Sequence, residues 1–581
     1  MQPDQSISRR TFLRLSGASF ALLTMAGVTA CGPADESTQS RGVERIGASI
    51  PAATFQPDLE LTLTARQDEV AILPGAPTKV WRYAATVEQG DPASVQPVPD
   101  SYLGPIIRVQ RGQKVRIHFK NELPEASIVH WHGLLVPSDM DGHPDAVVEP
   151  GASYTYEFEV RNRAGSYWFH PHPHGRTGPQ VYNGLAGLFL VSDEEERGLE
   201  LPRGEQDIPL VLQDRTFDAN NQLVYMAAGM GGMMDQMMGF LGERILVNGQ
   251  PDTQLPVATR AHRLRLYNGS NSRIYKLAWS NGMPMTVIGT DGGLLAEPVE
   301  RPYVTLGPAE RVEVWADFRS EAVGSALKLQ SLAFSGVEAG MMMGGMPQSN
   351  MMQNMMGMAA ALPNGEPFDV LTVQVAREEA ESLTLPTQLP PIEHHAVADA
   401  VNGDQPRHFT FAMDNNMAWT INGRTFVMDE VAEDETVHFG DLELWHFYNG
   451  MTATGSDTSA GGMMGGMMGH GGHMGHGNQS DQNNQSGMMG GGMMDFMAHP
   501  VHLHGVQFQV VARTIDDDQR AGWETVKEGY VDVGWKDTVL MMPGEMVQVL
   551  MRFDAYAGRY LYHCHNLEHE DQGMMRNFEI V

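Results

Sequence analysis

The sequence predicts an all-β protein made of several β-sandwich domains. Three observations predict this class: apolar and polar residues alternate in many short stretches, no long stretch repeats with the period of a helix, and 63 glycines and 34 prolines supply turns. A chain of 581 residues also exceeds what one hydrophobic core usually serves. Two or three domains are therefore expected.

Four stretches carry the alternation most clearly. Apolar side chains recur at every second position within residues 115–119, 154–160, 312–318 and 547–553. In an extended backbone such positions share one face, so each stretch is expected to bury one side against a core.

A faint internal repeat indicates the number of domains. Residues 115–121, 262–268 and 443–449 each form an alternating stretch that ends in asparagine, and three copies imply three similar domains. We predict sandwich domains over residues 57–199, 200–385 and 405–581, with a proline-containing linker between the last two.

The first 30 residues predict export. The motif SRRTFL at residues 8–13 and the mostly apolar stretch behind it match a twin-arginine signal, so we expect a periplasmic or cell-surface protein. The stretch is short and contains several polar residues and glycines, which favours a removed signal over a membrane anchor. Cys31 closes the lipobox-like VTAC, so a lipid anchor followed by a tether over residues 31–56 is expected; the alternative is ordinary cleavage after Ala30.

The charge balance limits the partners. A net charge of −32 at pH 7 excludes a general attraction to nucleic acid and disfavours anionic membrane surfaces. Membrane contact is therefore expected only through a lipid on Cys31, and we expect a monomer. Cations are compatible partners, although high charge can also serve solubility alone.

Three low-complexity segments hold most of the 40 methionines, at residues 226–238, 341–358 and 451–497. Their methionines are interspersed with glycine and cannot specify a core, so we expect mobile surface segments with exposed thioethers. The last segment is a Met-rich insertion into the third domain. A flexible linker or a sink for oxidants is the alternative interpretation.

Four histidine clusters carry the chemistry. They are HWHG at residues 130–133, HPHPH at 170–174, HPVHLHG at 499–505, and HCH at 563–565 followed by His569 and Met574. Residues two apart share a face of an extended chain, so His563 and His565 point together and Cys564 points the opposite way. One short strand can therefore connect two metal sites through covalent bonds.

The donor types indicate copper. One thiolate, two imidazoles and a weak axial thioether form the ligand set of a blue copper centre, which His499, Cys564, His569 and Met574 can supply. Structural zinc takes only four ligands and cannot account for so many donors. The remaining eight suffice for three more coppers: His130, His132, His170, His172, His502, His504, His563 and His565.

From about residue 57 to its end, the chain resembles the multicopper oxidases, and most of all the bacterial copper-efflux (cuprous) oxidases. The resemblance is carried by HCHNLEHEDQGMM at residues 563–575 and WFHPHPHG at residues 168–175. It implies three cupredoxin-like Greek-key β-sandwich domains and four copper ions, namely one type 1, one type 2 and two type 3.

The resemblance also implies the role of each residue. His130 and His502 would hold the type 2 copper, and the blue copper set would be the type 1 site, with Cys564 as the electron route. Asp141 and Glu570 match acidic residues that deliver protons to bound oxygen; the alternative is that both are exposed and solvated. The type 3 coppers would take His132, His170 and His565 on one side and His172, His504 and His563 on the other.

The substrate implied is Cu(I), because soft thioethers favour it. In copper-efflux oxidases an aspartate and a methionine just before the first blue-copper histidine bind this ion, and Asp495 and Met497 match them. Met413 and Asp414 match more loosely, because the family's own insert is not reproduced in place. The expected function is oxidation of Cu(I) coupled to reduction of O2 to water, which confers copper tolerance. A laccase-type phenol oxidase and a copper-sequestering lipoprotein are the alternatives.

Overall fold

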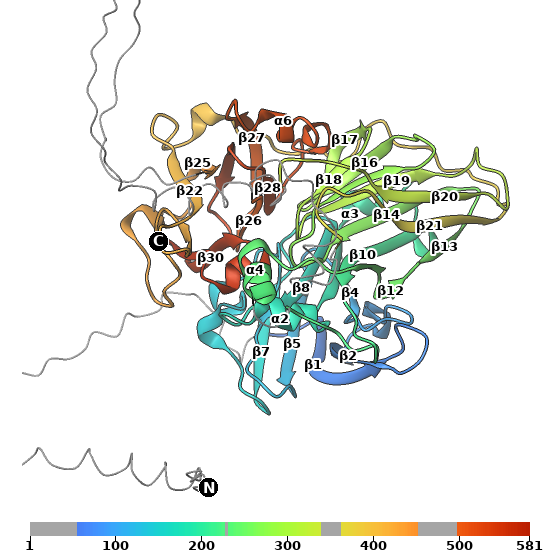
Figure 1. Ribbon diagram of the computed structural model, residues 1–581, viewed down its shortest axis with the longest axis horizontal. Helices are drawn as coiled ribbons and strands as arrows, with labels where there is room; N and C mark the ends of the chain where they lie inside the picture. The colour runs from blue at the N-terminus through green and yellow to red at the C-terminus, as the bar shows by residue number, and fades with distance from the viewer. Residues whose placement is uncertain (1–54, 227–229, 338–361, 451–496) are drawn as a thin grey trace, which may run out of the picture. The chain divides into compact units, whose positions relative to one another are not determined.

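The computed structural model describes residues 55–226, 230–337, 362–450 and 497–581. These residues form three successive pairs of β-sheets joined by loops and a few short helices (Figure 1). The predicted all-β fold is confirmed. The N-terminal signal, Cys31, Asp495 and two of the three methionine segments lie outside the described residues, apart from Met497.

The first pair of sheets lies within residues 59–192, with strand orders β2-β1-β5-β7 and β3-β4-β9-β8-β6. Alternate side chains such as Val115, Ile117 and Phe119 fill the core between the two sheets, together with Trp131. The strands are β1 (Leu59–Val70), β2 (Thr78–Gln89), β3 (Val95–Gln96), β4 (Ile106–Gln110), β5 (Lys114–Asn121), β6 (Val129–His130), β7 (Ser153–Glu159), β8 (Gly165–Pro171) and β9 (Gly187–Ser192).

The second pair, here called the middle domain, lies within residues 207–377, with orders β12-β11-β10-β14-β19-β16-β17 and β13-β21-β20-β15-β18. Its core contains Val312, Val314 and Phe318 from the predicted alternation. The strands are β10 (Asp207–Arg215), β11 (Arg244–Val247), β12 (Gln250–Pro251), β13 (Gln254–Ala258), β14 (Ala261–Asn268), β15 (Tyr275–Trp279), β16 (Met285–Thr290), β17 (Gly293–Arg301), β18 (Val304–Leu306), β19 (Arg311–Asp317), β20 (Ala326–Ser331) and β21 (Phe368–Arg377).

The third pair lies within residues 407–580, with orders β23-β22-β25-β29-β27 and β24-β31-β30-β26-β28. Val547, Val549 and Met551 alternate into its core, which also contains Cys564 and Met574. The strands are β22 (Arg407–Met413), β23 (Trp419–Ile421), β24 (Thr436–Val437), β25 (Leu442–Asn449), β26 (His499–Leu503), β27 (Phe508–Ile515), β28 (Thr538–Met541), β29 (Glu545–Arg552), β30 (Gly558–Cys564) and β31 (Met575–Ile580).

The three copies of the sequence repeat occupy the same place in their sheets. They form β5, β14 and β25, and each runs parallel to the first strand of its pair of sheets. The asparagine that ends each copy donates two hydrogen bonds from Nδ2 to backbone carbonyls: Asn121 to Glu125 and Val148, Asn268 to Arg273 and Leu306, and Asn449 to Met497 and Met541. The repeat therefore marks a buried clamp that satisfies carbonyls where loops meet the strand.

The helices of the described residues are short: α2 (Thr177–Tyr182), α3 (Glu194–Arg197), α4 (Met230–Met238), α6 (Arg520–Trp523) and α7 (Leu567–Asp571). No helix in these residues is long and apolar enough to cross a membrane. The expectation that residues 226–238 form a mobile surface segment is wrong for α4, which packs against α7 and buries Met237. An unbranched thioether side chain can fill an irregular gap, which explains why so simple a sequence is accommodated there.

Candidate metal centres

The structure gathers the histidine clusters between the first and third pairs of sheets. His130 on β6 pairs in register with His170 on β8, and His502 on β26 pairs with His563 on β30. The second histidine of each motif follows two residues later, on the same face. All eight candidate histidines outside the blue copper set are at most 1% exposed.

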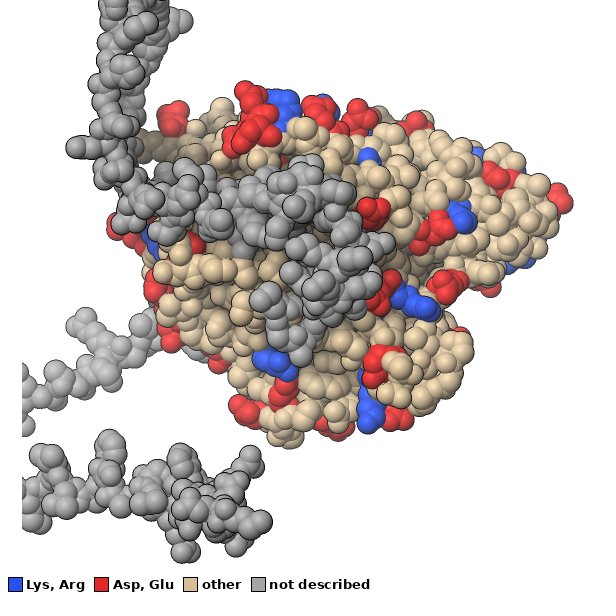
Figure 2. Space-filling view, viewed as in Figure 1, with Lys and Arg blue, Asp and Glu red and all other residues tan. Residues whose placement is uncertain are grey.

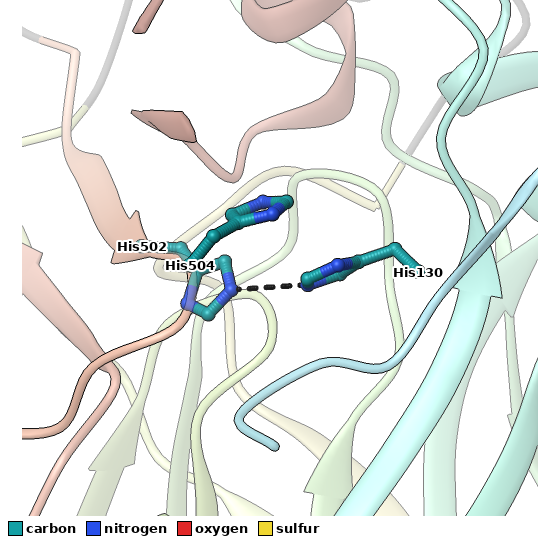
Figure 3. A group of neighbouring side chains, drawn as sticks. All are labelled: His130, His502 and His504. Atoms are coloured by element: carbon teal, nitrogen blue, oxygen red, sulfur yellow. Dashed lines mark hydrogen bonds between the residues drawn. The ribbon is translucent and has the colours of Figure 1, made fainter. Parts of the chain in front are cut away.

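The eight imidazoles form three groups with ring nitrogens close together. His130 Nε2 lies 3.3 Å from His502 Nε2, and Figure 3 shows the nitrogen-bearing edges of these two rings meeting beside His504. His170 Nε2 lies 3.4 Å from both His132 Nδ1 and His565 Nε2. His563 Nε2 lies 3.3 Å from His172 Nε2 and 3.0 Å from His504 Nε2. These contacts bring together the residues of each ligand set that the resemblance implies.

The hydrogen bonds on the outer side of the rings show which ring nitrogen carries the proton and which presents a lone pair to the other imidazoles. His130 Nδ1 lies 2.8 Å from the carbonyl oxygen of Asp141, and His502 Nδ1 lies 2.7 Å from that of Asp537. A carbonyl oxygen can only accept, so both Nδ1 atoms carry the proton and both Nε2 atoms present lone pairs. Two lone pairs 3.3 Å apart repel each other, and a cation between them would remove the repulsion.

The same reasoning applies to the other groups. His170 Nδ1 donates to the Pro171 carbonyl at 2.9 Å, and His563 Nδ1 donates to the Cys564 carbonyl at 3.1 Å. Burial lowers the pKa of His170 to about 4 and that of His172 to about 3, so both rings are neutral near pH 7. Neutral imidazoles with converging lone pairs are ready to bind metal without losing a proton.

A second, smaller site lies on the other side of β30. His499 Nδ1 lies 3.3 Å from Cys564 Sγ, and His569 Nδ1 lies 3.7 Å from the same sulfur. Met574 is fully buried, and its carbonyl accepts from the Cys564 N–H at 3.0 Å. Burial raises the pKa of the Cys564 thiol, so a bound metal would be needed to hold it as a thiolate.

Comparisons with known proteins identify the family. Two family models described as multicopper oxidase match residues 79–196 and 400–581. The solved structure of a variant of the multicopper oxidase McoA from Aquifex aeolicus is 31% identical, superposes with a TM-score of 0.68, and aligns over 90% of this chain and 97% of that one. The chain belongs to the multicopper oxidase family.

This multicopper oxidase also resembles curated enzymes over most of its length. It is 29% identical to a laccase from Bacillus stratosphericus, over 87% of this chain and 91% of the laccase. It is 26% identical to a bilirubin oxidase from Albifimbria verrucaria, over 97% of this chain and 88% of that enzyme. The protein is accordingly an oxidoreductase with copper cofactors and O2 as its electron acceptor.

Asp141 and Glu570 of this multicopper oxidase lie beside the histidine groups. Both are 1% exposed, so the alternative of solvated surface carboxylates is wrong. Asp141 Oδ2 lies 2.7 Å from His504 Nδ1, and Glu570 Oε2 lies 3.2 Å from His563 Nδ1. Burial raises the pKa of Asp141, which makes it better able to hold a proton near the cluster.

The candidate substrate residues are partly placed. Met497 is 7% exposed and belongs to the same apolar cluster as Cys564, and Met413 and Met238 pack against that cluster. Asp414 accepts hydrogen bonds from Asn416 and Ala418 within its own turn. Asp495 lies outside the described residues.

Sequence reasoning missed several residues around the sites of the multicopper oxidase. Asp537 and Thr538 contact His132 and His502, and the carbonyl of Met237 accepts from His569 Nε2 at 3.1 Å. A charged Lys-Asp pair just before the apolar strand β28 was the only sequence signal for Asp537. Nothing in the sequence pointed to Met237, because it contacts His569 through its backbone carbonyl, a group that every residue carries.

Proposed function

We propose that this multicopper oxidase binds four copper ions and couples the oxidation of four Cu(I) ions to the reduction of one O2 to two waters. The convergence of imidazole lone pairs in a dry interior is the observation that carries the proposal. The type 1 ligands would be His499, Cys564, His569 and Met574; the type 2 ligands His130 and His502; and the type 3 ligands His132, His170, His172, His504, His563 and His565.

The chain supports this division of labour through its own residues. Bound copper would supply one-electron redox chemistry, which lets four separate donors serve one four-electron acceptor. Cys564 lies between His563 and His565, which belong to the two type 3 groups, so covalent bonds join the thiolate to both. Asp141 and Glu570 would relay protons to the histidine groups, because four protons must accompany the four electrons.

Cu(I) is favoured as the substrate by the thioethers near His499. Met497 lies two residues before this histidine, and Met413 and Met238 pack on the same cluster. Figure 2 shows acidic side chains scattered over the visible face, and the net charge of −32 at pH 7 favours approach of a cation. A soft, cationic electron donor fits both features.

The experiment compares Cu(I) with a phenol as electron donor in steady-state oxygen uptake. The double variant Asp495→Asn/Met497→Leu should lower Cu(I) oxidation by about tenfold, equivalent to about 1.4 kcal/mol, and keep the blue absorption. Met285→Leu, buried in the middle domain, is the matched control and should change neither. Zinc in place of copper, or fewer than four coppers per chain, would contradict the copper assignment.

Deleting residues 451–494 separates the alternatives. The deletion should raise the Cu(I) concentration that gives half the maximal rate, because thioethers that collect the ion are removed. If Cu(I) kinetics do not change and the intact protein already oxidises phenols quickly, it is a laccase. Copper binding without oxygen uptake would indicate a sequestering lipoprotein.

We further propose export by the twin-arginine route and anchoring through a lipid on Cys31. The motif at residues 8–13 and VTAC at residues 28–31 support it. The wild-type protein should partition with membranes, and Cys31→Ala should release it, as fractionation and mass spectrometry of the N-terminus would measure. A soluble wild-type protein with an unmodified Cys31 would contradict the proposal.

A further inference from the structure

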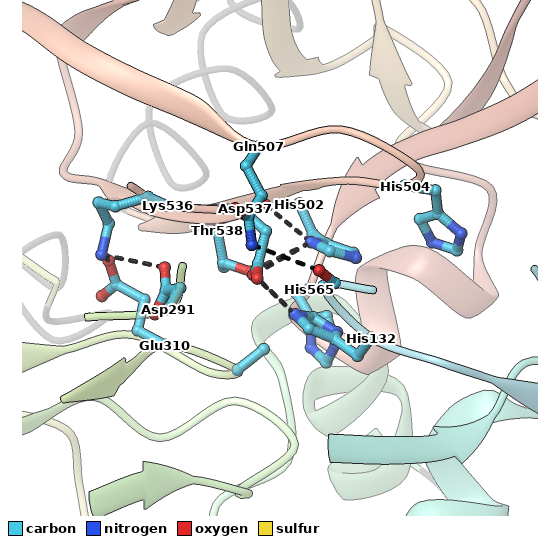
Figure 4. A network of polar contacts seen from close by, with 12 residues as sticks. His132, Asp291, Glu310, His502, His504, Gln507, Lys536, Asp537, Thr538 and His565 are labelled. Carbon is cyan, nitrogen blue, oxygen red and sulfur yellow. Dashed lines mark hydrogen bonds and ion pairs between the residues drawn. The ribbon is translucent and has the colours of Figure 1, made fainter. Parts of the chain in front are cut away.

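A buried cluster of charged side chains connects the middle domain with the copper ligands. Asp291, Glu310 and Arg311 come from the middle domain, and Lys536 and Asp537 precede β28 in the third. None of the five is more than 4% exposed. Figure 4 shows Asp291 and Glu310 meeting Lys536 on one side, and Asp537 next to His132 and His502 on the other.

Arg311 holds both oxygens of Asp537. Its Nη1 and Nη2 each donate at 2.6 Å, one to Oδ1 and the other to Oδ2. The remaining donors are satisfied by backbone carbonyls, since Nε donates to Ser166, Nη1 to Ala309 and Nη2 to Asp291. All five N–H groups of the guanidinium are used, which fixes its plane and the plane of the carboxylate.

Asp537 in turn holds two imidazoles. Its Oδ1 lies 3.0 Å from His132 Nε2, and its backbone carbonyl lies 2.7 Å from His502 Nδ1. The carboxylate keeps the His132 proton on Nε2, so Nδ1 is left to face His170 Nε2 at 3.4 Å. His132 is thus turned relative to most of the candidate copper ligands, whose Nε2 atoms face the other imidazoles. Its orientation depends on Asp537.

The space for this arrangement is provided by Gly133. A Cβ atom there would lie 2.3 Å from Asp537 Oδ2 and 3.0 Å from Arg311 Nη2, and the residue has a φ of +81°. No other residue fits this backbone conformation beside the ion pair without displacing it.

We propose that Arg311 is a positioning residue for the type 2 and type 3 copper ligands and acts through Asp537 on His132 and His502. Among the described residues, the middle domain supplies none of the proposed copper ligands. Through Arg311 it nevertheless sets the tautomer of His132 and positions the backbone carbonyl that accepts from His502. The inference rests on the proposed assignment of these histidines to copper.

The middle domain contains a matched control. Arg263 is 1% exposed, so it is as buried as Arg311, and it too donates to carboxylates, those of Glu313 and Glu196. Among the described residues, its side-chain hydrogen-bond partners are these two glutamates, and neither is a candidate copper ligand. Replacing either arginine with lysine keeps the charge but removes the two-pronged contact.

The test uses the full-length holoenzymes of Arg311→Lys and Arg263→Lys. A lysine has one nitrogen and leaves the Asp537 carboxylate free to turn, so Arg311→Lys should weaken binding of the most easily removed copper about tenfold or more. It should also change the hyperfine splitting of the type 2 copper in electron paramagnetic resonance, while the blue absorption stays at the wild-type value. Arg263→Lys should lower the melting temperature without changing the copper affinity or the spectrum.

Wild-type copper affinity and type 2 splitting in Arg311→Lys would overturn the positioning role. If Arg311→Lys does not fold, Asp537→Asn keeps the shape of the side chain and should shift the same splitting; an unshifted spectrum would overturn the inference equally. A wild-type protein without four coppers would overturn the proposed function instead, so the two failures are distinguishable.

Discussion

The buried imidazoles have their protons placed by acceptors on the side of each ring that faces away from the metal centre. Backbone carbonyls of Asp141, Asp537 and Pro171 fix His130, His502 and His170. These acceptors belong to the backbone, so the tautomers follow from the fold and not from the residue type at the acceptor position. His504 and His132 instead donate to side-chain carboxylates, those of Asp141 and Asp537.

Proton supply can be tested one residue at a time. Glu570→Gln and Asp141→Asn should slow oxygen reduction by about 10²-fold, because each removes a carboxyl group that can relay protons beside the copper-binding histidines. The blue absorption and the rate of type 1 reduction, measured by stopped flow, should stay near wild type. Glu443→Gln is a control, since this buried carboxylate pairs with Arg407 instead. Copper loss from either variant would show that the residue is structural.

At the scale of elements, β30 and α7 together carry candidate ligands of both metal sites and so connect the two sites. Cys564 and His563 end β30, and α7 brings His569 back toward the sulfur. Glu568 anchors α7 to the middle domain by accepting from Tyr225 at 2.7 Å and Asn271 at 2.8 Å. A ligand helix of only five residues is thereby held in place from outside its own domain.

Helix α4 covers the outer nitrogen of His569, so it should limit which donors reach the type 1 site. Replacing residues 230–238 with a Gly-Ser linker of equal length should raise phenol oxidation about tenfold, because the His569 ring edge becomes accessible. Met233→Ser, at a position 61% exposed, keeps the helix and should change nothing. Steady-state oxygen uptake with a bulky phenol is the measurement, and an unchanged rate would show that α4 does not restrict access.

At the scale of the whole molecule, burying neutral histidines makes the stability of the apoprotein depend on pH. Burial lowers the pKa of His499 to about 3, whereas the unfolded chain has an ordinary value near 6.5. Between these values the unfolded state binds the proton and the folded state does not. Each such histidine should therefore cost stability as the pH falls, by about 2 kcal/mol at pH 5.

Thermal and denaturant unfolding of the metal-free protein at pH 7 and pH 5 would measure the loss. The apoprotein of His499→Asn should lose about 2 kcal/mol less than wild type over this interval, because asparagine does not titrate there. The comparison cancels the general effect of acid on so acidic a chain. An equal loss in both proteins would contradict the assigned protonation state of His499.

The sequence by itself determined the fold class, the three-fold repeat and the chemistry of the donors. These features depend on short-range spacing: a period of two in extended backbone places His563 and His565 on one face and Cys564 on the other, whatever lies around them. The same period identified the core positions in β5, β19 and β29. The asparagine at the end of each repeat was detectable because its clamp is made in every copy.

Only the tertiary structure decided which groups surround the donors. Arg311 meets Asp537, and Met237 meets His569, across separations of hundreds of residues that leave no periodic signal in the chain. The burial of Asp141 and Glu570 likewise depends on how the first and third pairs of sheets meet. Ligand identity is a property of residue type and local spacing, whereas orientation, tautomer and access are properties of contacts between domains, which form only when the chain has folded.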